Sequence, residues 1–177
     1  MAYNHTFVED QFRAVHFFVR HLAYYRGLLD AKERLTHNIE FWDSTRDGHL
    51  KLAAIAWCSV FGQDSENLHW KNTPKDNLQQ AQQDFRNMLF SRTGFNPQQW
   101  KAYHKDMVDF RSRFVAHFDL RTRIEPVPVP LPQFDPALHV AYAYQEWVSA
   151  LDSRYSFRHP TLSFIYEQYK AEAFSLT

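Results

Sequence analysis

The chain has 177 residues and no formal net charge, with 20 Lys and Arg balanced by 20 Asp and Glu. This balance excludes a molecule that binds polyanions over its whole surface, so any contact with nucleic acid must use a local basic patch. The length suffices for one domain whose core needs no metal or disulfide for stability. Aromatic residues make up 17% of the chain and only four residues are Gly, which favours packed helices over a turn-rich β fold.

Three sequence features predict the compartment. Cys58 is the single cysteine, which excludes an intramolecular disulfide and a multi-cysteine metal site and fits a reducing compartment. The first residues lack the basic and apolar runs of a signal peptide. The longest apolar stretch, 52–61, is about half of the roughly 20 residues that span a bilayer. We therefore expect a cytoplasmic protein with no membrane segment.

The first half of the chain predicts three helices. From position 8 to position 29, apolar residues recur at steps of three, four or seven, which is typical of one face of a long helix. These residues are Val8, Phe12, Val15, Val19, Leu22 and Leu29. A second helix is expected from Ala31 to about Trp42, and a third from Asp47 to Phe61. Gly62 and the polar run after it predict the end of the third helix, because Gly readily closes a helix C-terminus.

Cap residues mark the helices of the second half. A fourth helix is expected from Pro74 to about Phe90, with Thr93 and Gly94 closing it. Asn96 suits an N-cap and Pro97 the first turn of a fifth helix, which would run to about Leu120.

Two more helices are expected near the end of the chain. Asp135 and Pro136 repeat the cap pattern, and apolar stripes predict a sixth and a seventh helix after them. The stripe residues are Val140, Tyr144, Trp147 and Leu151, then Leu162, Ile165, Tyr169 and Ala173. Internal repeats and strand-like alternation are absent from the sequence. The whole chain, 1–177, therefore predicts one all-α domain, an up-and-down bundle of about six to seven helices.

A proline-rich connector, 121–134, separates the fifth and sixth helices. Prolines alternate with other residues from Glu125 to Pro132, and each proline fixes φ and removes a backbone donor, which forces an extended path. Such a stretch can bind an aromatic groove, but a strut along the bundle is the simpler expectation.

The fifth helix has an apolar face with polar residues at both edges. At about 100° per residue, its apolar residues fall in one narrow arc that should face the core. They are Trp100, Tyr103, Met107, Phe110, Phe114 and Phe118. Arg111 and His117 flank this arc on opposite sides, about 120° apart.

The same region is locally basic, since positions 101–123 hold six Lys or Arg and three Asp. A phosphate could be attracted there. The simpler interpretation is that His117 is a buried, hydrogen-bonded histidine and that Asp109 and Arg113 form a surface pair.

The segment from Asp109 to Asp119 resembles the motif of HEPN domains, in which Arg and a polar residue are followed by His after four to six positions. The matching residues are Arg111, Ser112 and His117. The stretch from Ala56 to Lys71 is similar to one in uncharacterised bacterial proteins of this type. HEPN domains are helical bundles, and many are metal-independent endoribonucleases of toxin–antitoxin, phage-defence or RNA-processing systems. The resemblance therefore implies a HEPN-like bundle that binds or cleaves RNA.

The residue types suit that chemistry. A histidine that titrates near neutrality can take the proton of an RNA 2′-hydroxyl, and arginine can stabilise the charged phosphate. His117 and Arg111 are therefore the catalytic candidates, with no metal or cofactor, and the product would be a 2′,3′-cyclic phosphate. Other candidates assist them: Ser112, Arg113 and Asp119 as supporting residues, and Lys105, Arg121, Arg123, His69 and Trp70 as binding residues.

The resemblance also bears on partners. HEPN domains commonly pair so that two motifs form one cleft, and the wide angle between Arg111 and His117 makes a homodimer the natural arrangement. An antitoxin protein would be a further partner. The sequence departs from the family at two positions. Ser112 replaces the usual Asn, Asp or His, which puts activity in doubt. Asp119 replaces the Tyr of members silenced by a nucleotidyltransferase, so that mode of control is not expected.

A non-catalytic dimerisation or interaction module is the alternative, with the fifth helix as its surface. His69 and Trp70 could stack a base, although anchoring of their loop is the simpler role. His16 and His21 lie on different helix faces, and no His-Glu-x-x-His arrangement occurs, so no metal site is expected. Cys58, on an apolar helix, should behave as a small hydrophobe.

Overall fold

The fold was analysed in a computed structural model, which describes residues 5–73, 77–116, 130–151 and 160–175. These residues form six α-helices and no strand, so the prediction of an all-α protein is confirmed. The helices are α1 (His5–Asp30), α2 (Ile39–Phe61), α3 (Leu78–Thr93), α4 (Pro97–Phe110), α6 (Phe134–Leu151) and α8 (Leu162–Ser175). No helix in this part of the chain is both long and apolar enough to cross a bilayer.

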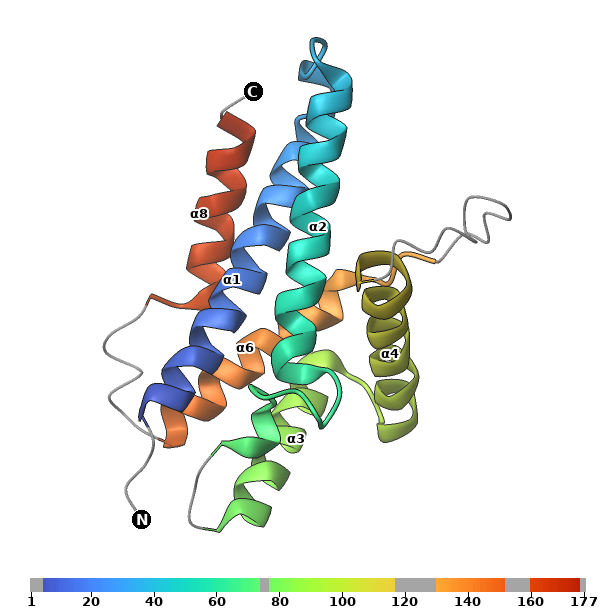
Figure 1. The fold of residues 1–177 in the computed structure, drawn as a ribbon. Coiled ribbons are helices and arrows are strands. Elements are labelled where there is room, and N and C mark those ends of the chain that lie inside the picture. The colour runs from blue at the N-terminus through green and yellow to red at the C-terminus, as the bar shows by residue number, and fades with distance from the viewer. Residues whose placement is uncertain (1–4, 74–76, 117–129, 152–159, 176–177) are drawn as a thin grey trace.

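The two longest helices, α1 and α2, lie side by side as an antiparallel pair, and α8 packs along α1 on the side away from α2 (Figure 1). Helix α6 passes beneath this pair and packs against α3. Helix α4 stands beside the C-terminal half of α2. The bundle thus leaves the C-terminal end of α2 surrounded by α3, α4 and α6.

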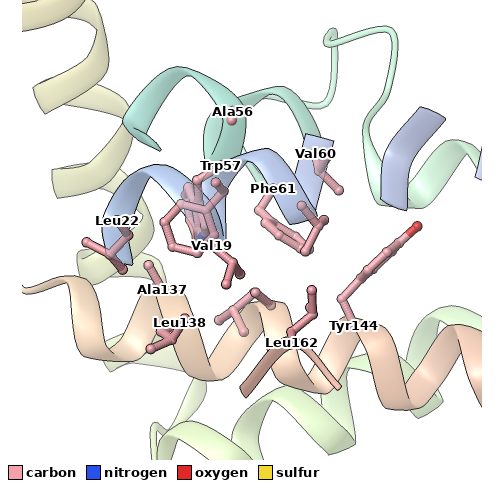
Figure 2. Close-up of a cluster of buried hydrophobic side chains, with 14 of the residues drawn as sticks. Val19, Leu22, Ala56, Trp57, Val60, Phe61, Ala137, Leu138, Tyr144 and Leu162 are labelled. Atoms are coloured by element: carbon pink, nitrogen blue, oxygen red, sulfur yellow. The ribbon is translucent and has the colours of Figure 1, made fainter. Parts of the chain in front are cut away.

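The core is aromatic, as the composition predicts. The predicted apolar stripe of α1 is buried up to Leu22, with Val8, Val15, Val19 and Leu22 fully inaccessible to solvent, but Leu29 at its end is exposed. Trp57 and Phe61 of α2 reach into the same cluster, and the ring of Phe61 meets that of Tyr144 edge-on at 5.6 Å (Figure 2). Burial of such side chains stabilises the fold by roughly 1.5–3 kcal/mol each.

The prediction of separate second and third helices is wrong. A short 3-10 turn, η1 (Lys32–Arg34), follows α1, and one continuous helix then runs from Ile39. It starts after Asn38, whose φ of 54° is left-handed. The polar residues 43–46, which lie between the two expected helices, are accommodated inside α2 because their side chains bond locally. Arg46 pairs with Asp43 at 2.8 Å, and Thr45 donates to the Phe41 carbonyl at 2.8 Å.

The predicted start of the fourth helix is also wrong, because α3 begins at Leu78, after the left-handed Asn77 (φ 58°). Pro74 lies outside the described residues. The predicted stop is confirmed, with Gly94 at φ 70° closing α3.

The predicted N-cap of α4 is confirmed, and the predicted N-cap of α6 is wrong. Asn96 caps α4 in a capping box with Gln99, as the Asn-Pro pattern indicates. Helix α6 starts at Phe134, so Asp135 lies in its first turn rather than at the N-cap and pairs with Arg26 at 2.7 Å. Of the predicted connector, 121–134, residues 121–129 lie outside the described residues, 130–133 are not helical, and Phe134 already belongs to α6.

Two glycines in helix interiors test the packing. A Cβ on Gly27 would lie 2.6 Å from the carbonyl oxygen of Lys170 and 2.7 Å from the Cβ of Ala173. Gly27→Ala should therefore push α8 from α1 and lower the free energy of unfolding by about 1–3 kcal/mol. Gly48 has open space around it, so Gly48→Ala should raise stability by about 0.5–1 kcal/mol through helix propensity. Urea unfolding of both variants checks this, and a Gly27→Ala protein as stable as the wild type would contradict the described contact of α1 with α8.

Candidate functional site

Helix α4 does not continue as a regular α-helix past Phe110. The chain changes to a π-helical turn, η3 (Arg111–Ala116), and Arg111 is its first residue. The part of the predicted apolar arc that lies on α4 faces the core, since Met107 and Phe110 are buried and Trp100 and Tyr103 pack against the core. The wheel's 100° step does not hold beyond Phe110, because a π turn contains more residues per turn.

Arg111 is held by an acidic partner. Its guanidinium forms an ion pair with the carboxylate of Glu66, which belongs to the segment between α2 and α3. Both side chains are about one-quarter exposed, 26% for Arg111 and 25% for Glu66. The pair therefore joins η3 to the segment that follows α2, and the Arg111 guanidinium reaches solvent only in part.

The other candidate residues near Arg111 differ in their exposure and in their partners. Ser112 is half-buried and Arg113 is exposed. Lys105, a predicted binding residue, pairs with Asp109 at 2.5 Å, and this contact lowers the pKa of Asp109. The predicted pair of Asp109 with Arg113 is therefore replaced by a pair one turn earlier.

Four candidate residues cannot be placed. His117, Asp119, Arg121 and Arg123 all lie outside the described residues. The catalytic pair Arg111 and His117 is therefore described only at Arg111. In the sequence, His117 comes directly after Ala116, the last residue of the π turn.

Hydrogen bonds from the buried side chain of Gln11 on α1 hold positions 62–73, the segment between α2 and α3, in place. The Gln11 side chain is fully buried. Its Nε2 donates to the carbonyl oxygens of Leu68 (3.0 Å) and His69 (3.1 Å). Its Oε1 accepts from the hydroxyls of Thr73 (2.9 Å) and Tyr144 (2.9 Å). All four hydrogen-bonding positions of the amide are used, so the segment has one fixed path.

His69 and Trp70 stand on this anchored segment and are buried, with exposed fractions of 2% and 6%. His69 caps a 3-10 turn, η2 (Trp70–Asn72), where its Nδ1 accepts from the Lys71 amide at 3.3 Å. Its Nε2 therefore carries the proton and lies 3.5 Å from Asp64 Oδ1. Burial lowers the pKa of His69 to about 4, so His69 is neutral at pH 7. These contacts support the anchoring role expected for the pair.

Two residues that sequence reasoning missed complete this region, Glu66 and His104. The Nε2 of His104 donates to the carbonyl oxygens of Phe61 and Gly62, both at 2.9 Å, and so caps the C-terminus of α2. His104 and Arg111 are seven residues apart, two helical turns, so both fall on the same side of the helix. That spacing was a usable signal for His104. Glu66 gave none, because its contact depends on the fold.

The Cys58 thiol and the pair of His21 with His49 are occupied by contacts within the protein. Cys58 is buried, donates to the Met107 carbonyl at 3.8 Å, and has its pKa raised to about 12 by burial. His21 and His49 share a hydrogen bond of 2.7 Å between their Nδ1 atoms, and burial lowers the pKa of His21 to about 4. Among the described residues, no three His, Cys, Asp or Glu side chains group as metal ligands.

The buried histidines predict acid sensitivity. The folded pKa of His69 is about 4, below its unfolded value near 6.5, so the unfolded chain binds the proton more readily. The free energy of unfolding should be highest above about pH 6.5. It should fall by about 1–3 kcal/mol per buried histidine as the pH approaches about 4. Urea unfolding between pH 7.5 and pH 4.5 measures this. His69→Asn should flatten the dependence and exposed His139→Asn should not, whereas equal slopes for the two variants would contradict a neutral, buried His69.

Comparison with protein-family models, with curated proteins and with solved structures finds no match to this chain. The likeness to HEPN domains therefore rests on Arg111, Ser112 and His117 within a helical bundle. Function must be argued from the site itself.

Proposed function

We propose that this chain is a HEPN-like RNA-binding protein and metal-independent endoribonuclease that uses Arg111 and His117. The observation that supports this most is the place of Arg111. It opens a π-helical turn directly before His117 in the sequence and is one-quarter exposed beside a carboxylate. Turns of this kind are rare within helices and are frequent at functional sites.

In the proposed reaction, neutral His117 removes the proton from the 2′-hydroxyl of the RNA. The freed oxygen attacks the adjacent phosphorus, the bond to the 5′-oxygen breaks, and the departing 5′-oxygen takes up a proton from water. Arg111, which is always charged, stabilises the negative charge that builds on the phosphate oxygens. The products are a 2′,3′-cyclic phosphate and a 5′-hydroxyl, and DNA, which lacks the 2′-hydroxyl, is not cleaved.

Glu66 has a defined role in this proposal. Its carboxylate occupies the guanidinium that an RNA phosphate would need. A phosphate would compete with it, since both are anions attracted to the same guanidinium. Glu66 thus holds Arg111 in position before RNA binds and competes with RNA for it.

The proposal includes a homodimer in the cytoplasm, in which motifs from two copies line one cleft. It also includes a role in a toxin–antitoxin or phage-defence system with an antitoxin protein as partner. The Arg-polar-His motif supports these parts through its resemblance to HEPN domains.

A second candidate function is a non-catalytic interaction module. The ion pair between Arg111 and Glu66 favours it, because this pair gives Arg111 a structural task, the attachment of η3 to the segment after α2. In that case Arg111 contributes to stability, by up to about 1 kcal/mol for a partly exposed pair, and not to RNA binding.

Cleavage of tRNA and messenger RNA by the purified chain in EDTA tests the two candidates. We expect cleavage with 2′,3′-cyclic phosphate ends, a loss of at least 100-fold in rate for His117→Ala, and a similar loss for Arg111→Ala. Exposed His139 of α6 provides the control, since His139→Ala should cleave like the wild type. The module is correct instead if no RNA is cleaved or bound and Arg111→Ala lowers the melting temperature.

A further inference from the structure

A cleft of about 490 Å³ lies between the segment after α2, helix α3 and the start of α4. Its size is in the range of small-molecule sites, about 300–1,000 Å³. Arg111 is not among the residues that line it, so the cleft is distinct from the ion pair of Arg111 with Glu66. The lining residues that matter here are Asp64, Trp70, Lys71, Arg86, Trp100 and Lys101.

The lining of the cleft is positively charged. Lys71, Arg86 and Lys101 face one carboxylate, Asp64. Lys71 Nζ lies 2.7 Å from both oxygens of Asp64, so these two groups neutralise each other. For Arg86 and Lys101, the described part of the chain offers no acidic partner within ion-pair distance. Among the described residues, Arg86 and Lys101 thus have no carboxylate that neutralises them, which suits an anion.

Two indole rings give the cleft an aromatic surface. Trp70 is buried, and the cations of Arg86 (5.5 Å) and Lys71 (5.9 Å) lie over its ring. This arrangement holds the Arg86 guanidinium at the cleft. Trp100 of α4 is only half-buried, with its inner side against Trp57 at 6.3 Å. Trp100 is therefore the ring on which a flat aromatic group can stack.

We infer that this cleft binds one nucleotide unit, with the base stacked on Trp100 and the phosphate held by Arg86 and Lys101. An aromatic ring and two cations that line one cleft can recognise the two parts of a nucleotide together, the base by its π-face and the phosphate by its charge. The nucleotide can be free or part of a single strand. The inference stands whether or not RNA is cleaved at Arg111.

Calorimetry with AMP, adenosine and a 12-nucleotide single-stranded RNA tests the inference on the full chain. AMP or the RNA should bind, and adenosine should bind at least 10-fold more weakly than AMP. The double variant Arg86→Gln/Lys101→Gln should lose at least 10-fold in affinity. Lys32→Gln/Arg34→Gln on η1, at the far end of α1 and α2 (Figure 1), removes the same charge and should bind like the wild type.

The stacking is tested separately at Trp100. Trp100→Phe should keep most of the affinity because it keeps a ring, and Trp100→Leu should lose it while circular dichroism shows the same fold. Binding of AMP alone identifies a free nucleotide as the ligand, and binding of RNA alone identifies a strand. The inference is overturned if neither probe binds at millimolar concentration, or if the Arg86/Lys101 and Lys32/Arg34 variants bind equally.

Discussion

A single buried side chain, Gln11, determines where the functional region lies. Its amide makes hydrogen bonds to two carbonyls and two hydroxyls, and three of these four partners belong to the segment between α2 and α3. A buried amide left unpaired costs about 1–3 kcal/mol for each missing bond, so the segment cannot move while the core stays intact. The positions of Glu66, His69 and Trp70 all follow from this anchor.

The anchored segment serves two neighbouring sites. Its residue Glu66 holds Arg111 of η3 by an ion pair. Residues Asp64, Trp70 and Lys71 line the cleft toward α3 and α4. His104, which bonds the end of α2, belongs to α4, the helix that leads into η3 and Arg111, and also lines the cleft. If both proposals hold, an RNA strand that contacts both sites would follow the segment after α2.

The sequence predicted the parts of this fold that depend on local pattern. The stripe of α1, the cap at Asn96 and the buried arc of α4 all follow from helical periodicity and cap chemistry. The continuity of α2 between Trp42 and Asp47 was not predicted. Polar residues such as those at 43–46 are common at helix ends, but their side chains can also bond within a helix. The π turn at Arg111 was missed because a 3.6-residue period assumes regular i→i+4 bonding. The pair of Glu66 with Arg111 was missed because its members are 45 residues apart.

The central claim is that Arg111 is a phosphate-binding residue that Glu66 restrains, and RNA affinity of the Glu66→Gln variant tests it most directly. Fluorescence anisotropy with a labelled single-stranded RNA, at fixed salt, should show several-fold tighter binding, because the phosphate no longer competes with a carboxylate. Glu146→Gln, which breaks the corresponding ion pair with Arg92, should leave the affinity unchanged. Unchanged or weaker RNA binding by Glu66→Gln, together with a lower melting temperature, would contradict the claim and leave Arg111 as a structural residue.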